Sequence, residues 1–198
     1  MLDVKTIEGK SNEELLEQIN VDDCHYVIEE QPAKLFKGKK FTLKYIEKKD
    51  VKSFIKEYIS NFAKSIDKKI NVEIRENENA YTVMLLSDDN AVIIGKDGKT
   101  LNSLQLLLHQ SLNNLTGFNI RISVDAGNYK SNKEKRLERT VKNICKDVLS
   151  SKIEVKLDPM NSYERRIVHN VVSEFENLTS LSEGEEPNRY VVIDYKED

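Results

Sequence analysis

The sequence predicts an α+β protein built from three small domains, over residues 1–48, 49–126 and 127–198. The chain alternates between two kinds of segment. In one kind, apolar residues recur every three or four positions, as in amphipathic helices. In the other, shorter kind, they recur at every second position, as in half-buried strands. A length of 198 residues fits several small domains as well as one. The run Ala126-Gly127-Asn128 marks the clearest boundary between two such sets of segments.

The first domain is expected to be a β-α-β-β unit. Ser11, followed three positions later by Glu14, is a capping-box pattern that predicts a helix over residues 12–19. The lysine-rich stretch QPAKLFKGKK predicts a turn between the last two strands. The three strands are expected at residues 2–7, 24–29 and 41–46.

The second domain is expected to have the order α-β-β-α-α-β. Its first helix follows the i, i+3, i+4, i+7 rule over residues 51–66, and the alternation over 72–85 predicts an antiparallel hairpin with a turn at 76–79. A short helix over 88–94 ends at Gly95, and a longer helix runs from Gly98 to Gly117, before a strand at 120–124. The longer helix is expected to bury Leu101, Leu104, Leu107, Leu108 and Leu112.

The third domain is expected to pack two helices on a small antiparallel sheet. A basic helix reaches residue 149, and within it the stretch Lys130 to Lys146 holds seven basic residues and two acidic ones. The stretch SLSEGEEPN is interpreted as a polar loop. The other elements are a strand at 153–157, a helix at 162–175 and a strand at 190–195.

Composition favours a binding protein over an enzyme. Cys24 and Cys145 are far apart and form no Cys-x-x-Cys pair, which argues against a zinc site or a disulfide framework. There is no Cys–His nucleophile pair, metal-binding cluster or closely spaced pair of carboxylates, so we expect no catalysis, cofactor or metal. The apolar runs are too short to cross a membrane, and no apolar signal region opens the chain, so a cytoplasmic protein is expected.

The net charge of −3 is unusual for a nucleic-acid-binding protein, but the basic residues are clustered.

The stretch AVIIGKDGKTL, residues 91–101, offers two interpretations. A nucleotide-binding P-loop needs Gly-x-x-x-x-Gly-Lys-Ser/Thr, and Ile93 stands where its first glycine would be. The segment before the loop is also expected to be helical, whereas a P-loop follows a buried strand. Nucleotide hydrolysis is therefore disfavoured.

The same stretch is a Gly-x-x-Gly turn, which lets a sugar-phosphate backbone approach closely because glycine has no Cβ. Two isoleucines, the Gly-x-x-Gly, a lysine and Thr-Leu-x-x-Leu-Gln, set in the order α-β-β-α-α-β, resemble the prokaryotic (type II) KH domain over residues 49–125. The resemblance implies RNA contacts at Gly95, Lys96, Asp97, Gly98 and Lys99, beside a groove built from residues such as Ile93, Ile94 and Leu104. The carboxylate of Asp97 is expected to reduce the affinity for phosphate.

The segment MNSYERRIVHNVV places Arg165 and His169 one helical turn apart, on a cationic stripe that includes Arg166. With Asp-Pro-Met-Asn before it and Ser-Glu-Gly-Glu-Glu-Pro-Asn-Arg after it, this helix resembles the R-x-x-x-H domain over residues 127–198. The resemblance implies phosphate or stacking contacts by Arg165 and base contacts by His169. Arg136 on the basic helix and Arg189 after the acidic loop complete the expected surface.

A KH domain followed directly by an R-x-x-x-H domain, with a small β-α-β-β unit in front, resembles the bacterial Jag family, also called KhpB or SpoIIIJ-associated proteins. The resemblance implies a non-catalytic cytoplasmic protein that binds single-stranded RNA, with single-stranded DNA as a second candidate, in the control of cell elongation and the cell envelope. It also implies a small KH partner of the KhpA type, with a homodimer as an open alternative. The stretch Lys34 to Lys39 departs from the family's Lys-Lys-Gly-Phe-Leu-Gly loop, and the family's frequent charged linker is missing. A protein-interaction scaffold that uses the KH fold for dimerisation or docking is the alternative function.

Overall fold

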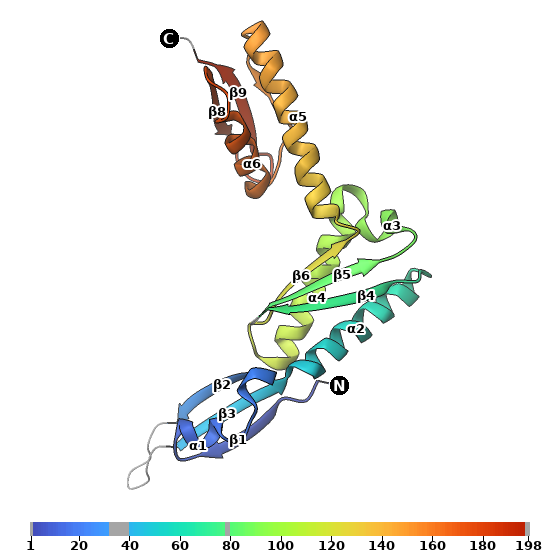
Figure 1. Ribbon diagram of the computed structural model, residues 1–198, viewed down its shortest axis with the longest axis vertical. Coiled ribbons are helices and arrows are strands. Elements are labelled where there is room, and N and C mark those ends of the chain that lie inside the picture. Colours follow the sequence, from blue (N-terminus) through green and yellow to red (C-terminus); the bar gives the residue numbers. More distant parts are fainter. Residues whose placement is uncertain (1, 32–39, 78–79, 197–198) are drawn as a thin grey trace. The chain divides into compact units, whose positions relative to one another are not determined.

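The computed structural model describes residues 2–31, 40–77 and 80–196 (Figure 1). The chain divides into two compact units, residues 1–127 and 128–198. Two three-stranded sheets lie in the first unit and one lies in the second, and helices accompany each sheet. This arrangement confirms the α+β class. The further division of the first unit at residue 48 stays a prediction.

The first sheet contains β1 (Lys5–Gly9), β2 (Cys24–Gln31) and β3 (Lys40–Glu47), in the antiparallel order β1-β3-β2. The backbone N–H of Glu14 donates to Ser11 Oγ over 3.2 Å at the start of α1 (Asn12–Leu16), so the predicted cap is confirmed. Two expected limits were wrong, because β1 begins after Leu2 and Val4, and α1 ends three residues before Ile19. Most of the predicted lysine-rich turn, residues 32–39, lies outside the described residues. A 3-10 turn, η1 (Val21–Asp23), precedes β2.

The next elements confirm the predicted order α-β-β-α-α-β. The strands β4 and β5 form the expected antiparallel hairpin, and β6 joins β5 in parallel, which gives the order β4-β5-β6. The tip of the hairpin, residues 78–79, lies outside the described residues. The elements are α2 (Lys48–Ser65), β4 (Asn71–Asn77), β5 (Ala80–Leu86), α3 (Asn90–Ile94), the 3-10 turn η2 (Lys96–Gly98), α4 (Lys99–Thr116) and β6 (Arg121–Ala126).

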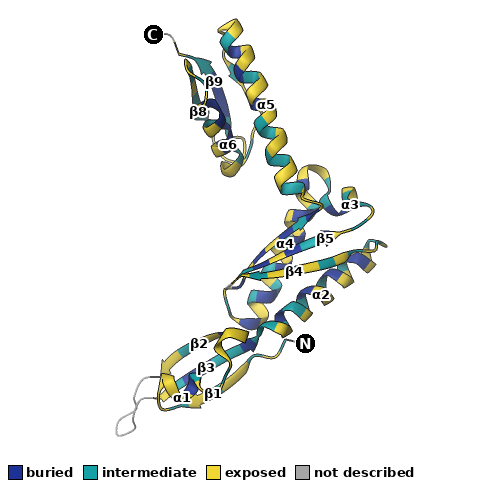
Figure 2. Cartoon of the chain, viewed as in Figure 1, coloured by how far each residue is buried: buried dark blue, intermediate teal, exposed yellow. Residues whose placement is uncertain are grey.

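Between α2 and β6, the buried side chains lie where the helices pack against the sheet β4-β5-β6 (Figure 2). On α4, Leu101, Leu104, Leu108 and Leu112 are buried as predicted. Leu107 is 53% exposed, so its expected burial was wrong. The buried leucines already fill the stripe defined by steps of three and four residues, and Leu107 lies beside that stripe.

The second unit has the predicted plan of two helices on an antiparallel sheet. Its strands have the order β7-β9-β8. The buried core is formed by Val141, Cys145, Val148, Ile167, Val168, Val171, Val172, Val191 and Ile193. The elements are α5 (Tyr129–Ser151), β7 (Val155–Lys156), α6 (Ser162–Val172), β8 (Leu178–Glu183) and β9 (Tyr190–Tyr195).

Three expectations for this unit need correction. The segment interpreted as a polar loop from Ser180 onwards contains most of β8. Ile153 is 66% exposed and lies outside β7, so the strand expected at 153–157 keeps only two residues. The second helix ends at Val172 and does not reach Phe175. None of the described helices is long and apolar enough to cross a membrane.

A buried hydrogen bond joins the two sheets of the first unit. His25 Nε2 on β2 lies 2.7 Å from the Tyr81 hydroxyl on β5, and the two rings meet edge to face. Burial raises the pKa of the Tyr81 hydroxyl, so this hydroxyl stays protonated and able to donate. The contact links the sheet β1-β3-β2 to the sheet β4-β5-β6, whose strand β5 precedes the Gly-x-x-Gly segment.

Replacing Tyr81 by Phe should therefore destabilise the first unit, because the buried imidazole of His25 loses a hydrogen-bond partner. We expect the free energy of unfolding, measured by urea denaturation, to fall by about 1–3 kcal/mol. Tyr26, 40% exposed on β2, provides the matched control, and its change to Phe should have little effect. Equal effects of the two substitutions would contradict a stabilising role for this hydrogen bond.

Candidate nucleic-acid interface

The turn between α3 and α4 is built on backbone conformations that favour glycine. Gly95 has φ 69° and ψ −178°, and Gly98 has φ 82° and ψ 13°. A Cβ atom on Gly95 would collide with the side chain of Thr100. The Gly95 N–H donates to the carbonyl of Ala91 over 2.8 Å and so closes α3. Both glycines of the Gly-x-x-Gly are thus required by the backbone path itself.

Asp97 also occupies the left-handed region, with φ 55° and ψ 21°. Asp and Asn enter this region more readily than most residues that have a side chain. From the sequence, Asp97 was expected only to place an unfavourable charge near phosphate. The structure adds a conformational reason for an aspartate at this position.

The beginning of α4 offers backbone donors and positive charge at one place. Gly98 is the N-cap residue and has no side chain to accept hydrogen bonds from the first turn. Backbone N–H groups at the start of a helix, with the positive end of the helix dipole, attract anions. Lys96 and Lys99 are both exposed beside this end. The arrangement is suited to a phosphate group.

The expected apolar groove beside the turn needs correction. Ile93 is fully buried and belongs to the core, whereas Leu104, 4% exposed, lines a hollow of about 410 Å³ together with Thr100 and Leu107. Ile94 is half-buried. Val92, which was not predicted as a site residue, is 43% exposed in the same helix. Ile93 therefore supports the surface from below, while Ile94 and Val92 are accessible from solvent.

In the second unit, His169 lies between two serines of β8. Its Nδ1 is 2.7 Å from Ser180 Oγ, and its Nε2 is 2.9 Å from Ser182 Oγ. Burial, together with the positive charge of Arg165, lowers the pKa of His169. A neutral ring fits this setting, because one nitrogen donates to one serine and the other accepts from the second.

Arg165 is not a free surface cation. Its side chain is 9% exposed, its Nη1 donates to the carbonyl of Met160 over 2.8 Å, and its Nη2 lies 2.7 Å from Glu186 Oε1. Glu186 belongs to the acidic stretch between β8 and β9, and its side chain is 60% exposed. Any anion that reaches the Arg165 guanidinium must therefore compete with this carboxylate.

The other predicted arginines differ in accessibility. Arg166 on α6 and Arg136 on α5 are exposed. Arg189 is half-buried, and its Nε has no hydrogen-bond partner among the described residues. The structure brings Arg165 and His169 to one side of α6, one turn apart, and it places Arg136 on a different helix.

Several residues of this surface were not predicted from the sequence. Tyr163 is 61% exposed, and its pKa is raised chiefly by the charge of Glu134 on α5, with Arg166 acting in the opposite direction. The spacing of Tyr163 and Arg166, three residues apart on a helix, could have revealed that they are neighbours. No such signal was available for Ser180, Ser182 and Glu186, because their roles depend on how β8 and the following turn meet α6.

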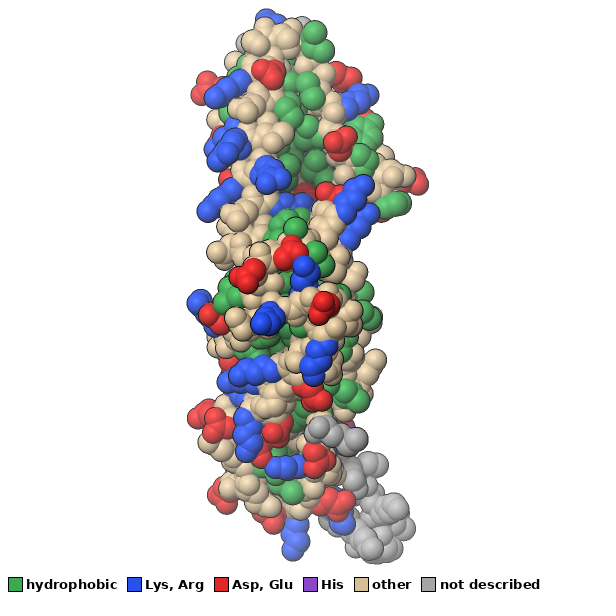
Figure 3. Space-filling view, turned by 90° about the vertical axis from the view of Figure 1, so that its right-hand side faces the viewer, with side chains coloured by type: hydrophobic (Ala, Val, Ile, Leu, Met, Phe, Trp, Pro, Cys, Tyr) green, Lys and Arg blue, Asp and Glu red, His purple; other side chains and the backbone are tan. Residues whose placement is uncertain are grey.

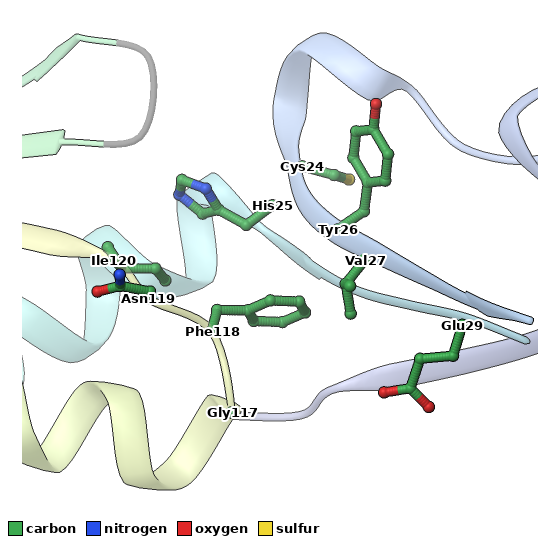
Figure 4. Close-up of a pocket in the computed structure, with 9 residues that line it drawn as sticks. All are labelled: Cys24, His25, Tyr26, Val27, Glu29, Gly117, Phe118, Asn119 and Ile120. Atoms are coloured by element: carbon green, nitrogen blue, oxygen red, sulfur yellow. The ribbon is translucent and has the colours of Figure 1, made fainter.

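A separate cavity of about 570 Å³ lies in the first unit, between β2 and the segment after α4. Figure 4 shows Phe118 directed toward Val27, with Tyr26 and His25 further along the same strand. Because α4 begins at Lys99 and the cavity lies beyond its end at Thr116, about 27 Å of helix separates the cavity from the Gly-x-x-Gly turn. The cavity is therefore not part of that turn.

Among the described residues, no group of three or more His, Cys, Asp or Glu side chains is arranged to hold a metal ion. Cys24 and Cys145 are buried free thiols, and burial raises the pKa of each. A raised pKa keeps a thiol protonated and unreactive at neutral pH.

These features define a two-module protein, in which a Gly-x-x-Gly turn lies in an α-β-β-α-α-β unit and an Arg-x-x-x-His helix lies in the unit that follows. The KH-domain model of the KhpA/KhpB proteins matches residues 52–124, and the R-x-x-x-H-domain model matches residues 135–195.

Comparison with curated relatives agrees with these matches. RNA-binding protein KhpB of Clostridium symbiosum is 34% identical over 200 residues, which cover 97% of this chain and 89% of the relative. RNA-binding protein KhpB of Bacillus subtilis (strain 168) is 32% identical over 164 residues, which cover 82% of this chain and 79% of the relative. The chain belongs to the KhpB family, and the predicted family resemblance is confirmed.

The setting of His169 predicts a pH dependence of stability. Because the pKa of His169 is lowered from 6.5 in the folded state, the unfolded chain takes up the proton first as the pH falls. The contribution of His169 to stability is complete above pH 6.5 and is lost as the pH drops through the lowered pKa.

We expect hydrogen-exchange protection of α6 and β9, corrected for intrinsic exchange, to decrease from pH 7.5 to about pH 5 in the wild type. The decrease should be smaller in His169→Gln, which lacks the titrating ring. An identical pH dependence in the two proteins would rule out this role for His169.

Proposed function

We propose that this protein binds single-stranded RNA through the Gly-x-x-Gly turn and the R-x-x-x-H surface, without catalysing a reaction. The observation that carries the proposal is the uncapped start of α4, which lies beside exposed Lys96 and Lys99 on a glycine turn. Two relatives that align with most of the chain bear the name RNA-binding protein KhpB. Single-stranded DNA has the same phosphates and is a second candidate ligand.

At the turn, the RNA backbone would pass over Gly95, where no Cβ blocks the approach, while the buried Gly98 sets the left-handed start of α4. The first N–H groups of α4 would donate to phosphate oxygens, and Lys96 and Lys99 would add point charges. Ile94 and Val92 would supply the accessible apolar surface for bases, since Ile93 is in the core. The negative charge of Asp97 limits the affinity of this turn, so a second surface is needed for tight binding.

The R-x-x-x-H surface would supply that contact. Tyr163 is exposed and offers an aromatic face on which a base can stack, and Arg166 lies close enough for its charge to act on the Tyr163 hydroxyl. Arg165 would contact a phosphate only after Glu186 releases it. His169, held by Ser180 and Ser182, would position the adjoining part of α6 and β8.

We also propose that the protein acts in the cytoplasm as a regulator of cell elongation and the cell envelope. In this role it would act together with a small KH protein of the KhpA type or as a homodimer. The alternative function is a protein-interaction scaffold. The cavity between β2 and the segment after α4 favours this alternative, because it joins an edge strand to half-buried aromatic side chains.

The double substitution of Lys96 and Lys99 by Gln should weaken RNA binding and its dependence on salt. Each lost phosphate contact lowers the slope of log affinity against log salt by about 0.7 for single strands, so the slope should fall by about 1.4. The control is Lys56→Gln with Lys64→Gln, two exposed lysines of α2. Filter binding of labelled RNA at several salt concentrations measures the slope. An unchanged slope, together with loss of a protein partner in a pulldown, would favour the scaffold.

The substitution Glu186→Gln should raise the affinity for RNA several-fold, because a neutral amide holds the Arg165 guanidinium less strongly than a carboxylate does. The control is Glu185→Gln, which removes the same charge from the neighbouring position. The Glu185 side chain makes no ion pair within the described part of the chain. If both variants change the affinity equally, general charge repulsion explains the effect, and the specific competition for Arg165 is refuted.

A further inference from the structure

The helix α5 carries a regular row of cations. Lys135, Arg139, Lys142 and Lys146 follow one another at steps of four, three and four residues. This spacing places all four side chains on one face of a helix. With a rise of 1.5 Å per residue, the row is about 16 Å long. We call these four residues the α5 row.

The α5 row points away from the core of the second unit. Val141, Cys145 and Val148 are buried against α6 and β9, whereas the four residues of the row are exposed. In Figure 3, Lys and Arg side chains gather along the upper part of the molecule, over α5. The row therefore lies on the solvent side of α5, and Lys142 at its margin reaches the end of α6, through Glu174.

Most of the row is not neutralised within the protein. Lys142 lies 3.0 Å from Glu174, but in the described part of the chain Lys135, Arg139 and Lys146 have no ion pair. The helix's own acids Glu134 and Glu138 act on Tyr163 from the flank beside α6, and Glu138 also acts on Lys142 of the row. Like charges at this spacing repel one another, so the row is unfavourable in the isolated protein.

We propose that the α5 row is a third RNA-binding surface, besides the Gly-x-x-Gly turn and the R-x-x-x-H surface, and that it holds the sugar-phosphate backbone of a single strand. This inference rests on the proposed function. The row consists of cations and contains no aromatic side chain on which a base could stack. Its contacts are therefore to phosphates and are independent of sequence.

The row and the Gly-x-x-Gly turn belong to different units of one chain, so the number of nucleotides in the RNA decides whether both can be occupied at once. A KH module holds about four nucleotides, so a four-nucleotide RNA bound at the turn has no further nucleotides to offer to another surface. A longer RNA can contact both surfaces, and the second contact then benefits from the high effective concentration created by the first. The α5 row should contribute to the binding of long RNA and have no effect on short RNA.

The test compares Lys135→Gln, Arg139→Gln and Lys146→Gln, combined in the full chain, with the wild type. Glutamine is a good helix former, so α5 should persist, and circular dichroism checks this. The matched control combines Lys56→Gln, Lys64→Gln and Lys69→Gln, which remove three exposed lysines from the first unit. Fluorescence anisotropy with four-nucleotide and twenty-nucleotide oligouridine, over a range of salt concentrations, measures affinity and slope.

For the twenty-nucleotide RNA, the triple variant should lose about 2 from the salt slope and on the order of tenfold in affinity. It should match the wild type on the four-nucleotide RNA, and the control should match the wild type on both. A triple variant that equals the control on the long RNA would overturn the α5 proposal while RNA binding itself stands. Absence of salt-dependent binding in the wild type would overturn the proposed function and this inference together.

Discussion

The backbone turn between α3 and α4 is the constraint on which the candidate interface depends. Gly95, Asp97 and Gly98 all have positive φ within four residues, and Thr100 fills the space that a Cβ on Gly95 would need. The turn leaves the start of α4 without a side-chain cap and keeps Lys96 and Lys99 in solvent. A single conformational requirement thus explains the glycines, the aspartate and the lack of a side-chain cap at Gly98. The buried leucines of α4 fix this end of the helix on the sheet.

In the second unit, partly buried polar contacts hold the candidate binding residues, whereas in the first unit the backbone conformation of the turn positions them. His169 is held by two serines of β8, and Arg165 is held by Glu186 and by the carbonyl of Met160. Such contacts fix side-chain positions, because a partly buried polar group without a partner costs about 1–3 kcal/mol. They also mean that Arg165 can bind an anion only in place of the solvent-exposed carboxylate of Glu186. The α5 row differs from both, since its cations remain in water.

Most elements could be predicted from the sequence because their apolar residues follow the period of a helix or strand. The order α-β-β-α-α-β, the cap at Ser11 and the antiparallel hairpin of β4 and β5 are examples. The strand β8 was missed for a physical reason. Its positions that face α6 hold Ser180 and Ser182, which bind His169, while Leu181 is 63% exposed, so the usual pattern is inverted. The pairing of Arg165 with Glu186 joins residues on either side of β8 and leaves no periodic signal.

The binding of RNA at the Gly-x-x-Gly turn can be tested most directly by titrating the ¹⁵N-labelled full chain with single-stranded RNA and following NMR signals at residue resolution. We expect the backbone amide signals of Lys96 to Leu101 to shift with the RNA concentration, because phosphate oxygens accept hydrogen bonds from this turn. The signals of Gly117 to Ile120, beside the separate cavity, should stay in place. Shifts confined to the cavity, or an unchanged spectrum at the turn while RNA is bound, would contradict binding at the turn.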